Sequence, residues 1–173
     1  MAYRAPEALG SRHRFNEFDS GEPALDRWLK QHGLEAQSAG SARVFVTTLE
    51  DGETVVGYYA LAAAEVVPDA AIERSRRGQP QHRSIPAILL ARLAVHSEHQ
   101  RIGVGRSLLQ DALVRCVTAA DEIGARLLLV HAKHEEAKAW YVQYGFEASP
   151  TDPLNLQMLF KDVRKFLRDR GVI

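Results

Sequence analysis

A short glycine-rich segment, Gln100–Gly105 with the sequence QRIGVG, has the composition of an anion-binding loop. It follows the apolar run LLARLAV of Leu89–Val95 and leads into RSLLQDAL, whose apolar residues recur with helical spacing. The first amides of a helix have no intrahelical acceptor, and the helix dipole favours negative charge there. Because glycine has no Cβ, Gly103 and Gly105 let a phosphate approach the backbone. The segment therefore predicts a phosphate site at the start of a helix.

The glycine spacing excludes two common nucleotide-binding motifs. The chain has no G-x-x-x-x-G-K-[ST] sequence, which excludes a P-loop. The three-glycine pattern G-x-G-x-x-G of dinucleotide-binding folds is also missing. The alternative to an anion site is a glycine-rich turn between a strand and a helix that binds nothing.

Length and composition indicate an ordinary globular protein. The chain has 173 residues, 46% hydrophobic and 25% charged, with a formal net charge of zero. This length fits a single domain, residues 1–173. Zero net charge means that any nucleic-acid binding must come from a local basic patch. No apolar run reaches membrane-spanning length and the N-terminus lacks the apolar core of a signal peptide, so we expect a cytoplasmic protein with no membrane partner.

The one cysteine, Cys116, is expected to be a buried apolar residue on a helix. A single cysteine permits neither an internal disulfide nor a cysteine-based zinc site. The histidines and carboxylates are not clustered at metal-ligand spacing, so we expect no metal.

Apolar periodicity and turn residues predict alternating strands and helices. Asp19 or Ser20 is the expected cap of the first helix. A glycine within the strand at Val55–Val66, Gly57, indicates a bulge or a close backbone approach. The expected strands cover His13–Phe18, Ala42–Leu49, Val55–Val66, Ile88–Val95, Leu127–Ala132 and Leu156–Phe160. The expected helices begin near Glu22 and cover about Arg106–Ile123, Glu135–Tyr144 and Val163–Arg170, and Pro68–Pro86 is expected to be irregular.

The connections between these elements predict their pairing. A short turn joins Ala42–Leu49 to Val55–Val66, so these strands should pair antiparallel. A helix joins Ile88–Val95 to Leu127–Ala132, so these strands should be parallel neighbours.

Three segments in this order, LARLAV, QRIGVG and AWYVQYGF, resemble the GCN5-related N-acetyltransferases, or GNAT family. The resemblance extends from about residue 13 to residue 160. It implies an α/β (α+β) fold with a central mixed β-sheet flanked by helices. In this family the two central parallel strands splay apart, and acetyl-coenzyme A fills the gap.

The resemblance also implies which residues bind acetyl-coenzyme A. The strand edge Leu93, Ala94 and Val95 would pair with the amides of the pantetheine arm, and an amide near Val95 would stabilise the oxyanion. The loop would hold the pyrophosphate. Its expected residues are Gln100, Arg101, Ile102, Gly103, Val104, Gly105 and Arg106.

Tyr141 occupies the position of the family's general acid in the sequence Y-x-x-x-G-F. A thiol has a pKa near 8.5 and tyrosine one near 10, so a tyrosine stays protonated at neutral pH and can donate to the departing thiolate. Tyr144 is an alternative donor, and a purely structural role for Tyr141 is the other interpretation. No residue is selected as a general base.

The N-terminal phrase FDSGEPALDRWL, followed by ARVFV, VVGYYAL and SPTDPLNLQML, resembles the acetyltransferase toxins of bacterial toxin–antitoxin modules. Ser20 stands where these toxins often have cysteine. The resemblance implies a homodimer that acetylates the α-amine of aminoacyl-tRNA and so blocks translation. It also implies a ribbon-helix-helix antitoxin as partner. Two other interpretations are an acetyltransferase acting on a small-molecule, peptide or protein amine, and a binding module without chemistry, against which QRIGVG and Tyr141 argue.

Basic residues are candidates for contacts to the tRNA substrate, although a solvated mixed-charge surface is the alternative. Arg92 stands out because it interrupts an apolar strand, where a charge needs a partner or an open cleft. Arg76 and Arg77 are the other tentative substrate residues. The remaining candidates are Arg74, Arg83, Lys161, Arg164, Lys165 and Arg168.

Overall fold

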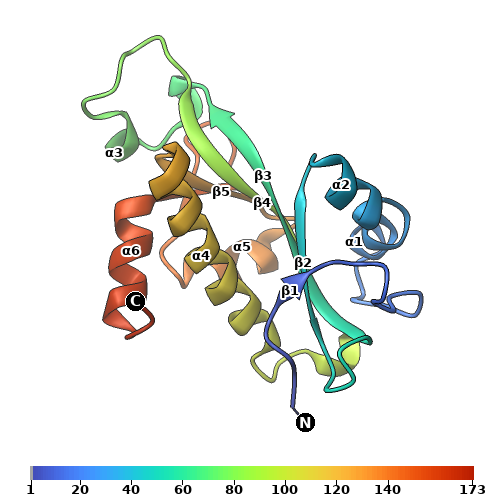
Figure 1. Ribbon diagram of the computed structural model, residues 1–173. Helices are drawn as coiled ribbons and strands as arrows, with labels where there is room; N and C mark the ends of the chain where they lie inside the picture. The colour runs from blue at the N-terminus through green and yellow to red at the C-terminus, as the bar shows by residue number, and fades with distance from the viewer. Residues whose placement is uncertain (1) are drawn as a thin grey trace. The chain divides into compact units, whose positions relative to one another are not determined.

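The computed structural model describes residues 2–173, which divide into two compact units (Figure 1). The first unit comprises the chain up to Ala62 together with Ala91–Ala112, and the second comprises Ala63–Leu90 and Leu113–Ile173. Three elements contribute residues to both units. They are β3 (Val55–Val66), β4 (Ile85–Val95) and α4 (Val104–Ile123).

In the first unit the strands are hydrogen-bonded in the order β1-β2-β3-β4. β1 (Glu7–Ala8) pairs antiparallel with β2 (Arg43–Thr48), and β2 pairs antiparallel with β3. The predicted hairpin is therefore confirmed. Its register shifts between Thr47 and Thr48, opposite Gly57, so the pairing is irregular beside this glycine.

One helical stretch packs on this part of the sheet. α1 (Pro23–Trp28) continues through a π-helical turn at Leu29–Gly33 into α2 (Leu34–Ala39), which contacts β2 (Figure 1). The predicted helix start near Glu22 is confirmed, but the predicted cap is wrong. Glu22 is the N-cap residue and its side chain makes no capping bond. Pro23 suits the first turn because an amide there would have no intrahelical acceptor.

The core of the first unit lies between these helices and strands. Tyr58 is fully buried, its hydroxyl donates to the carbonyl of Leu25 at 2.7 Å, and its ring meets Phe18 edge to face with centroids 5.7 Å apart. The apolar members of this cluster are Leu9, Phe18, Leu25, Leu29, Val44, Val46, Val55, Tyr58, Ala60 and Ala94.

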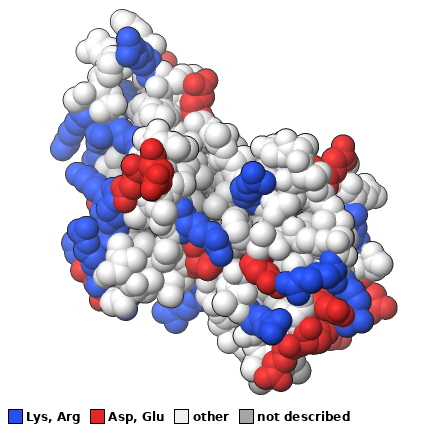
Figure 2. Space-filling model, viewed as in Figure 1, with Lys and Arg blue, Asp and Glu red and all other residues white. Residues whose placement is uncertain are grey.

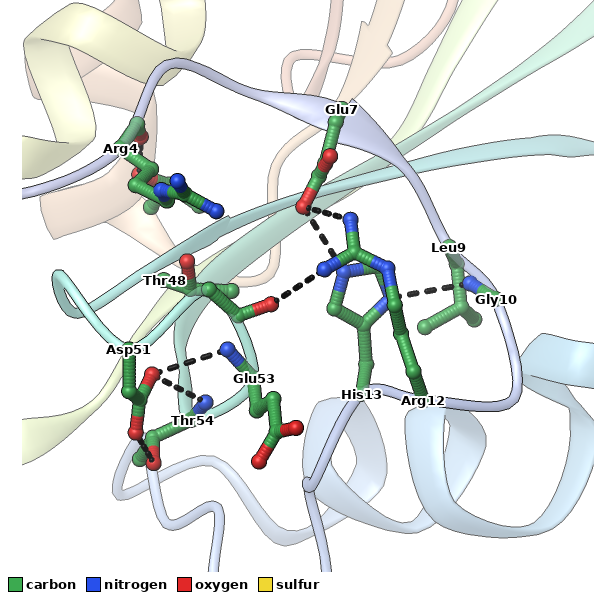
Figure 3. Close-up of polar contacts among 12 residues, drawn as sticks. Arg4, Glu7, Leu9, Gly10, Arg12, His13, Thr48, Asp51, Glu53 and Thr54 are labelled. Carbon is green, nitrogen blue, oxygen red and sulfur yellow. Dashed lines mark hydrogen bonds and ion pairs between the residues drawn. The ribbon is translucent and has the colours of Figure 1, made fainter.

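The predicted strand at His13–Phe18 is wrong. Only Arg14 forms a bridge there, with Thr54. Side chains rather than a strand ladder hold this segment. Arg14 contacts the carboxylate of Asp51 at 3.1 Å. Figure 3 shows that this carboxylate also accepts from the amide and hydroxyl of Thr54.

His13 links the same segment to β1 (Figure 3). The amide of Gly10 donates to His13 Nδ1 at 2.9 Å, so the ring hydrogen lies on Nε2, which contacts Glu7 Oε1 at 3.0 Å. Arg12 contacts the same oxygen at 2.5 Å and donates to the carbonyl of Gly52 at 2.8 Å. The hydrogen bond from His13, followed by that from Arg12, lowers the pKa of Glu7.

In the second unit the strand order is β3-β4-β5-β7-β6. β4 and β5 (Leu127–His131) are parallel, as predicted, with a register from Ala87–Leu127 to Leu90–Val130. β4 continues past this register through Ala91–Val95. β7 (Asn155–Leu159) pairs antiparallel with both β5 and β6 (Glu147–Ala148). The two-residue β6 was not predicted because it is too short to show an alternating pattern.

The helices of the second unit are α3 (Glu73–Arg76), α5 (Glu135–Val142) and α6 (Phe160–Asp169), together with the second half of α4. α6 begins three residues before the predicted start and buries Phe160, Val163 and Leu167 at helical spacing. Gly124, with φ of +78°, follows α4 in the conformation common after the end of a helix. Among residues 2–173, no helix has both the length and the apolar character needed to cross a membrane.

Gly57 is predicted to be intolerant of a side chain. A Cβ there would lie 2.8 Å from Leu108 Cδ1 and 3.3 Å from the carbonyl oxygen of Ala94, and Leu108 is itself fully buried. We expect Gly57→Ala to lower the free energy of unfolding by ~1–3 kcal/mol in urea titrations. Gly10→Ala is the control, because no atom lies within 4 Å of its added Cβ. Equal stability of the two variants would contradict this packing.

The Glu7 contacts predict a pH-dependent contribution to stability. A carboxylate whose pKa is lowered by folding stabilises the protein above its unfolded pKa, about 4.5, and the contribution is lost as the pH falls through the folded pKa. We expect Glu7→Gln to be less stable than the parent at pH 7, with a difference that shrinks below about pH 4. Thermal unfolding across pH measures this, and exposed Glu17→Gln is the control. A difference independent of pH would exclude the carboxylate contacts as its cause.

Candidate functional site

The loop between β4 and α4 has the backbone of an anion-binding turn. Arg101 has φ of +64° and Gly103 has φ of +97°, and Arg101 is the one non-glycine residue with positive φ in residues 2–173. Alternation of left- and right-handed residues turns successive amides toward a common concavity. A Cβ on Gly103 would have no atom within 4 Å, so the space beside this residue is open.

The first amides of α4 have no acceptor within the helix. The first α-helical bond runs from the amide of Ser107 to the carbonyl of Gly103 at 3.0 Å. Helix geometry therefore leaves the amides of Val104, Gly105 and Arg106 available to a ligand. These groups, together with the helix dipole, favour an anion at the predicted position.

The side chain of Gln100 does not point to this anion position as a donor. Its amide nitrogen donates to the carbonyls of Ser20 and Val95, both at 2.8 Å. Both N–H groups are therefore used within the protein. Gln100 connects the loop to the end of β4. Its contact to Ser20 joins residues distant in sequence and could not be predicted from local patterns.

The predicted strand-edge residues lie at the end of β4, beyond its register with β5. Leu93 is half-buried, and Ala94 and Val95 are buried. The amide of the next residue, His96, donates to the carbonyl of Val56 on β3 at 2.8 Å, which fixes this end of β4 to its neighbour. A backbone edge so fixed is suited to pair with the amides of an extended ligand.

A pocket of about 340 Å³ adjoins the loop. The N-terminal segment forms one side through Tyr3 and Pro6, and the loop and first turns of α4 form the other through Gly103 and Ser107. Tyr3 is tied to this region because its hydroxyl contacts Nδ1 of His99 at 2.8 Å.

Arg92 is stabilised by an aromatic stack. Its Cζ lies 4.2 Å from the ring centroid of Trp28, and Trp28 stacks on Tyr58 with ring planes 9° apart. A cation–π contact accounts for a charge within an apolar strand. Partial burial lowers the pKa of Arg92, but it remains a cation.

Tyr141 lies near the end of α5 in the second unit. Its ring meets Trp140 and Phe146 edge to face, with centroids 4.9 Å and 5.7 Å away, and burial raises its pKa. No hydrogen bond to its hydroxyl is found among residues 2–173, where every fully buried polar side-chain atom has a partner. Tyr144 is similarly buried and contacts Trp140 with centroids 5.2 Å apart.

Cys116 is fully buried on α4, as predicted. Burial raises the pKa of its thiol to about 12, so it is not a thiolate at neutral pH. Within residues 2–173, no three histidine, cysteine or acidic side chains come together in an arrangement suited to a metal ion.

Contacts of two arginines, Arg74 and Arg126, hold the segment around α3 in place within the second unit. Arg74 contacts Glu147 at 2.5 Å and Asp162 at 2.8 Å. Arg126 donates to the carbonyls of Ser75 at 2.6 Å and Arg77 at 3.1 Å. Arg74 is therefore engaged by carboxylates.

Arg76 and Arg77 are both exposed and, within residues 2–173, have no ion pair. They line a second pocket of about 600 Å³ together with His82 and Arg83. Unlike Arg74, these side chains remain free to contact an anionic partner.

Basic side chains also gather over α6. Figure 2 shows Lys and Arg over the region that α3 and α6 occupy in Figure 1, with acidic side chains among them. Arg164 contacts Asp121, and Lys165 contacts Asp169 at 2.6 Å. The predicted phosphate contacts of α6 are thus partly neutralised by neighbouring carboxylates.

Sequence reasoning missed the roles of two residues at the site. Trp28 was assigned no role, although it carries the Arg92 stack. Asp26 was not considered, although its buried carboxylate accepts from the amide and hydroxyl of Ser20. The only indication of the contact between Ser20 and Asp26 was that both residues lie in one short motif, FDSGEPALD.

Comparison with known proteins agrees with this geometry. The family model described as acetyltransferase (GNAT) domain matches residues 40–148. A tRNA-acetylating toxin from Mycobacterium tuberculosis is 48% identical over 167 residues, which cover 96% of this chain and 98% of that protein.

Two solved structures share the fold. The toxin AtaT complexed with acetyl-methionyl-tRNAfMet is 24% identical with a TM-score of 0.86, covering 96% of this chain and 99% of that one. An AtaT variant bound to the C-terminus of the antitoxin AtaR and acetyl-CoA is 23% identical with a TM-score of 0.81, covering 95% and 98%. The mixed α/β fold expected from the sequence is confirmed, and the chain belongs to the acetyltransferase (GNAT) domain family.

Proposed function

We propose that this protein is an acetyl-coenzyme A-dependent N-acetyltransferase that acetylates the α-amine of aminoacyl-tRNA and acts as the toxin of a type II toxin–antitoxin module. The observation that carries the proposal is the Gln100–Gly105 loop, which precedes the unbonded amides of α4 in a chain 48% identical to a tRNA-acetylating toxin. Residues 1–173 act as one acetyltransferase domain in this proposal.

The loop and the end of β4 bind the acetyl donor. The amides of Arg101–Arg106 hold the pyrophosphate, and the backbone of Leu93–Val95 pairs with the pantetheine arm. The open space beside Gly103 supports this assignment, as does the extension of β4 beyond its register with β5. An amide near Val95 stabilises the negative charge that develops on the thioester oxygen.

Tyr141 is the general acid. The amine nitrogen attacks the thioester carbonyl carbon, the C–S bond breaks, and the thiolate takes the phenolic proton of Tyr141, while the amine loses a proton to solvent. Burial raises the pKa of Tyr141, so the phenol stays protonated throughout the neutral range. Tyr144 is the second candidate donor. The raised pKa of Cys116 argues against an acyl-cysteine intermediate and supports direct transfer.

The acceptor is charged tRNA. Arg76 and Arg77 supply exposed, unpaired positive charge for its phosphates, and Arg92 is the third proposed contact. No metal takes part in the proposed reaction.

The remaining assignments concern partners and location. The protein forms a homodimer, is inhibited by a ribbon-helix-helix antitoxin and works in the cytoplasm, where charged tRNA is used. The complex of AtaT with the antitoxin AtaR supports an antitoxin as partner.

Gly103→Glu tests the pyrophosphate position. The carboxylate would enter the open space beside the α4 amides and repel a phosphate, so we expect calorimetry to detect no acetyl-coenzyme A binding. Gly124→Glu is the matched control, because Gly124 lies after the same helix with a similar positive φ and equally open surroundings. Retained affinity in Gly103→Glu, or equal loss in both variants, would refute the assignment.

Acetyl transfer to total charged tRNA tests the function directly. Radiolabelled acetyl groups should appear on the aminoacyl α-amine, and induction of the protein should arrest growth. We expect Tyr141→Phe to lower kcat by about 10²–10⁴-fold and to relieve the arrest. Tyr144→Phe, two residues beyond the end of α5, tests the second candidate donor and should retain most of the activity. Transfer to small amines or peptides but not to charged tRNA would favour the alternative acceptor and overturn the toxin assignment.

A further inference from the structure

The motif FDSGEPALD forms a connected set of hydrogen bonds that the proposed function does not yet use. Asp26 on α1 is only 9% exposed. Its carboxylate accepts from the Ser20 amide at 3.0 Å and 3.2 Å and from the Ser20 hydroxyl at 2.6 Å. The Ser20 hydroxyl in turn accepts from the amide of Glu22 at 3.2 Å. A buried carboxylate thus fixes the position of one residue before the helix.

The carbonyls of the same turn continue the set toward β4. Ser20 accepts from Gln100 Nε2 at 2.8 Å, and Asp19 accepts from the amide of Ser97 at 2.8 Å. Gln100 Nε2 also donates to the carbonyl of Val95 at 2.8 Å. The turn before α1 is therefore bonded to the β4–α4 connection at two places, Ser97 and Gln100.

We infer that Asp26, Ser20 and Gln100 are positioning residues for acetyl transfer. Asp26 fixes Ser20, and the carbonyls of Ser20 and Val95 fix the carboxamide of Gln100. This inference rests on the proposed function. The inference gives the motif FDSGEPALD a role beyond starting α1, because the contacts of the motif extend to the β4–α4 loop.

The geometry explains why the loop needs such support. Arg101 is a non-glycine residue at positive φ, a conformation that persists only where neighbouring contacts over-determine it. The amides that hold the donor and the amide near Val95 must also keep a fixed spacing, since a shift of about 1 Å costs about 10²-fold in rate. Gln100 is the side chain that bonds directly to the Val95 carbonyl and lies next to Arg101.

Gln100→Met tests this role with little change of shape. The variant lacks both N–H donors, so we expect KM for acetyl-coenzyme A to rise about tenfold and kcat to fall about 10-fold to 100-fold, with KM for charged tRNA unchanged. Gln37→Met is the matched control, since Gln37 Nε2 also donates to two carbonyls, of Leu9 and Val44, at 3.3 Å. The control should lose thermal stability without a change in either constant.

Two further variants keep the inference falsifiable if Gln100→Met folds poorly. Asp26→Asn removes one acceptor oxygen and should shift the same two constants in the same direction. Ser20→Cys, the residue common in related toxins, should retain most of the activity, whereas Ser20→Ala should not. Unchanged constants in folded Gln100→Met and Asp26→Asn would overturn the inference.

Amide hydrogen exchange provides a readout independent of activity. Gln100→Met should accelerate exchange in residues 96–106 of the ligand-free protein and leave β2 protected. Faster exchange with an unchanged KM for acetyl-coenzyme A would mean that the Gln100 contacts only stabilise the fold, and this result would contradict the inference. If the unmodified protein neither binds nor transfers acetyl groups, the proposed function fails, whereas normal transfer by Gln100→Met refutes only the positioning role.

Discussion

Unbonded amides at the start of α4 are the constraint on which the site depends. Donors that have no acceptor inside the helix must be solvated or meet an anion. Gly103 keeps the approach open, and the positive φ of Arg101 turns the preceding peptide toward it. The nearby packing is correspondingly tight, because Gly57 leaves room for Leu108 against the sheet. The helix, the loop and the sheet together hold these backbone amides in position for an anion.

Local patterns in the sequence were sufficient for much of the fold. The hairpin of β2 and β3, the parallel pair β4 and β5, and α4 were all predicted, because alternation, helical spacing and turn residues are local properties. The segment at His13–Phe18 was mispredicted because only Arg14 bridges a neighbouring segment, while side-chain contacts to Glu7 and Asp51 add to the local turns that hold it. Such contacts join residues distant in sequence and have no periodic pattern.

The site could be predicted to a similar extent as the fold. The prediction again missed contacts between residues that are distant in sequence. The glycine loop is contiguous, so its position could be read directly from the chain. The stack of Arg92 on Trp28 and the bond from Gln100 to Ser20 join residues 64 and 80 positions apart. The basic candidates could be ranked only after the structure showed that Arg74 meets two carboxylates while Arg76 and Arg77 meet none within residues 2–173.

Serine at position 20 also affects how the protein responds to oxidants and alkylating reagents. A cysteine there would place a thiol next to a carboxylate and within the contacts that lead to the donor loop. With serine, the only sulfhydryl in the chain is that of Cys116, which is fully buried and protonated at neutral pH. Oxidants and alkylating reagents act on accessible thiolates, and this chain presents none to them. Its activity should therefore be indifferent to the redox state of the surrounding cell.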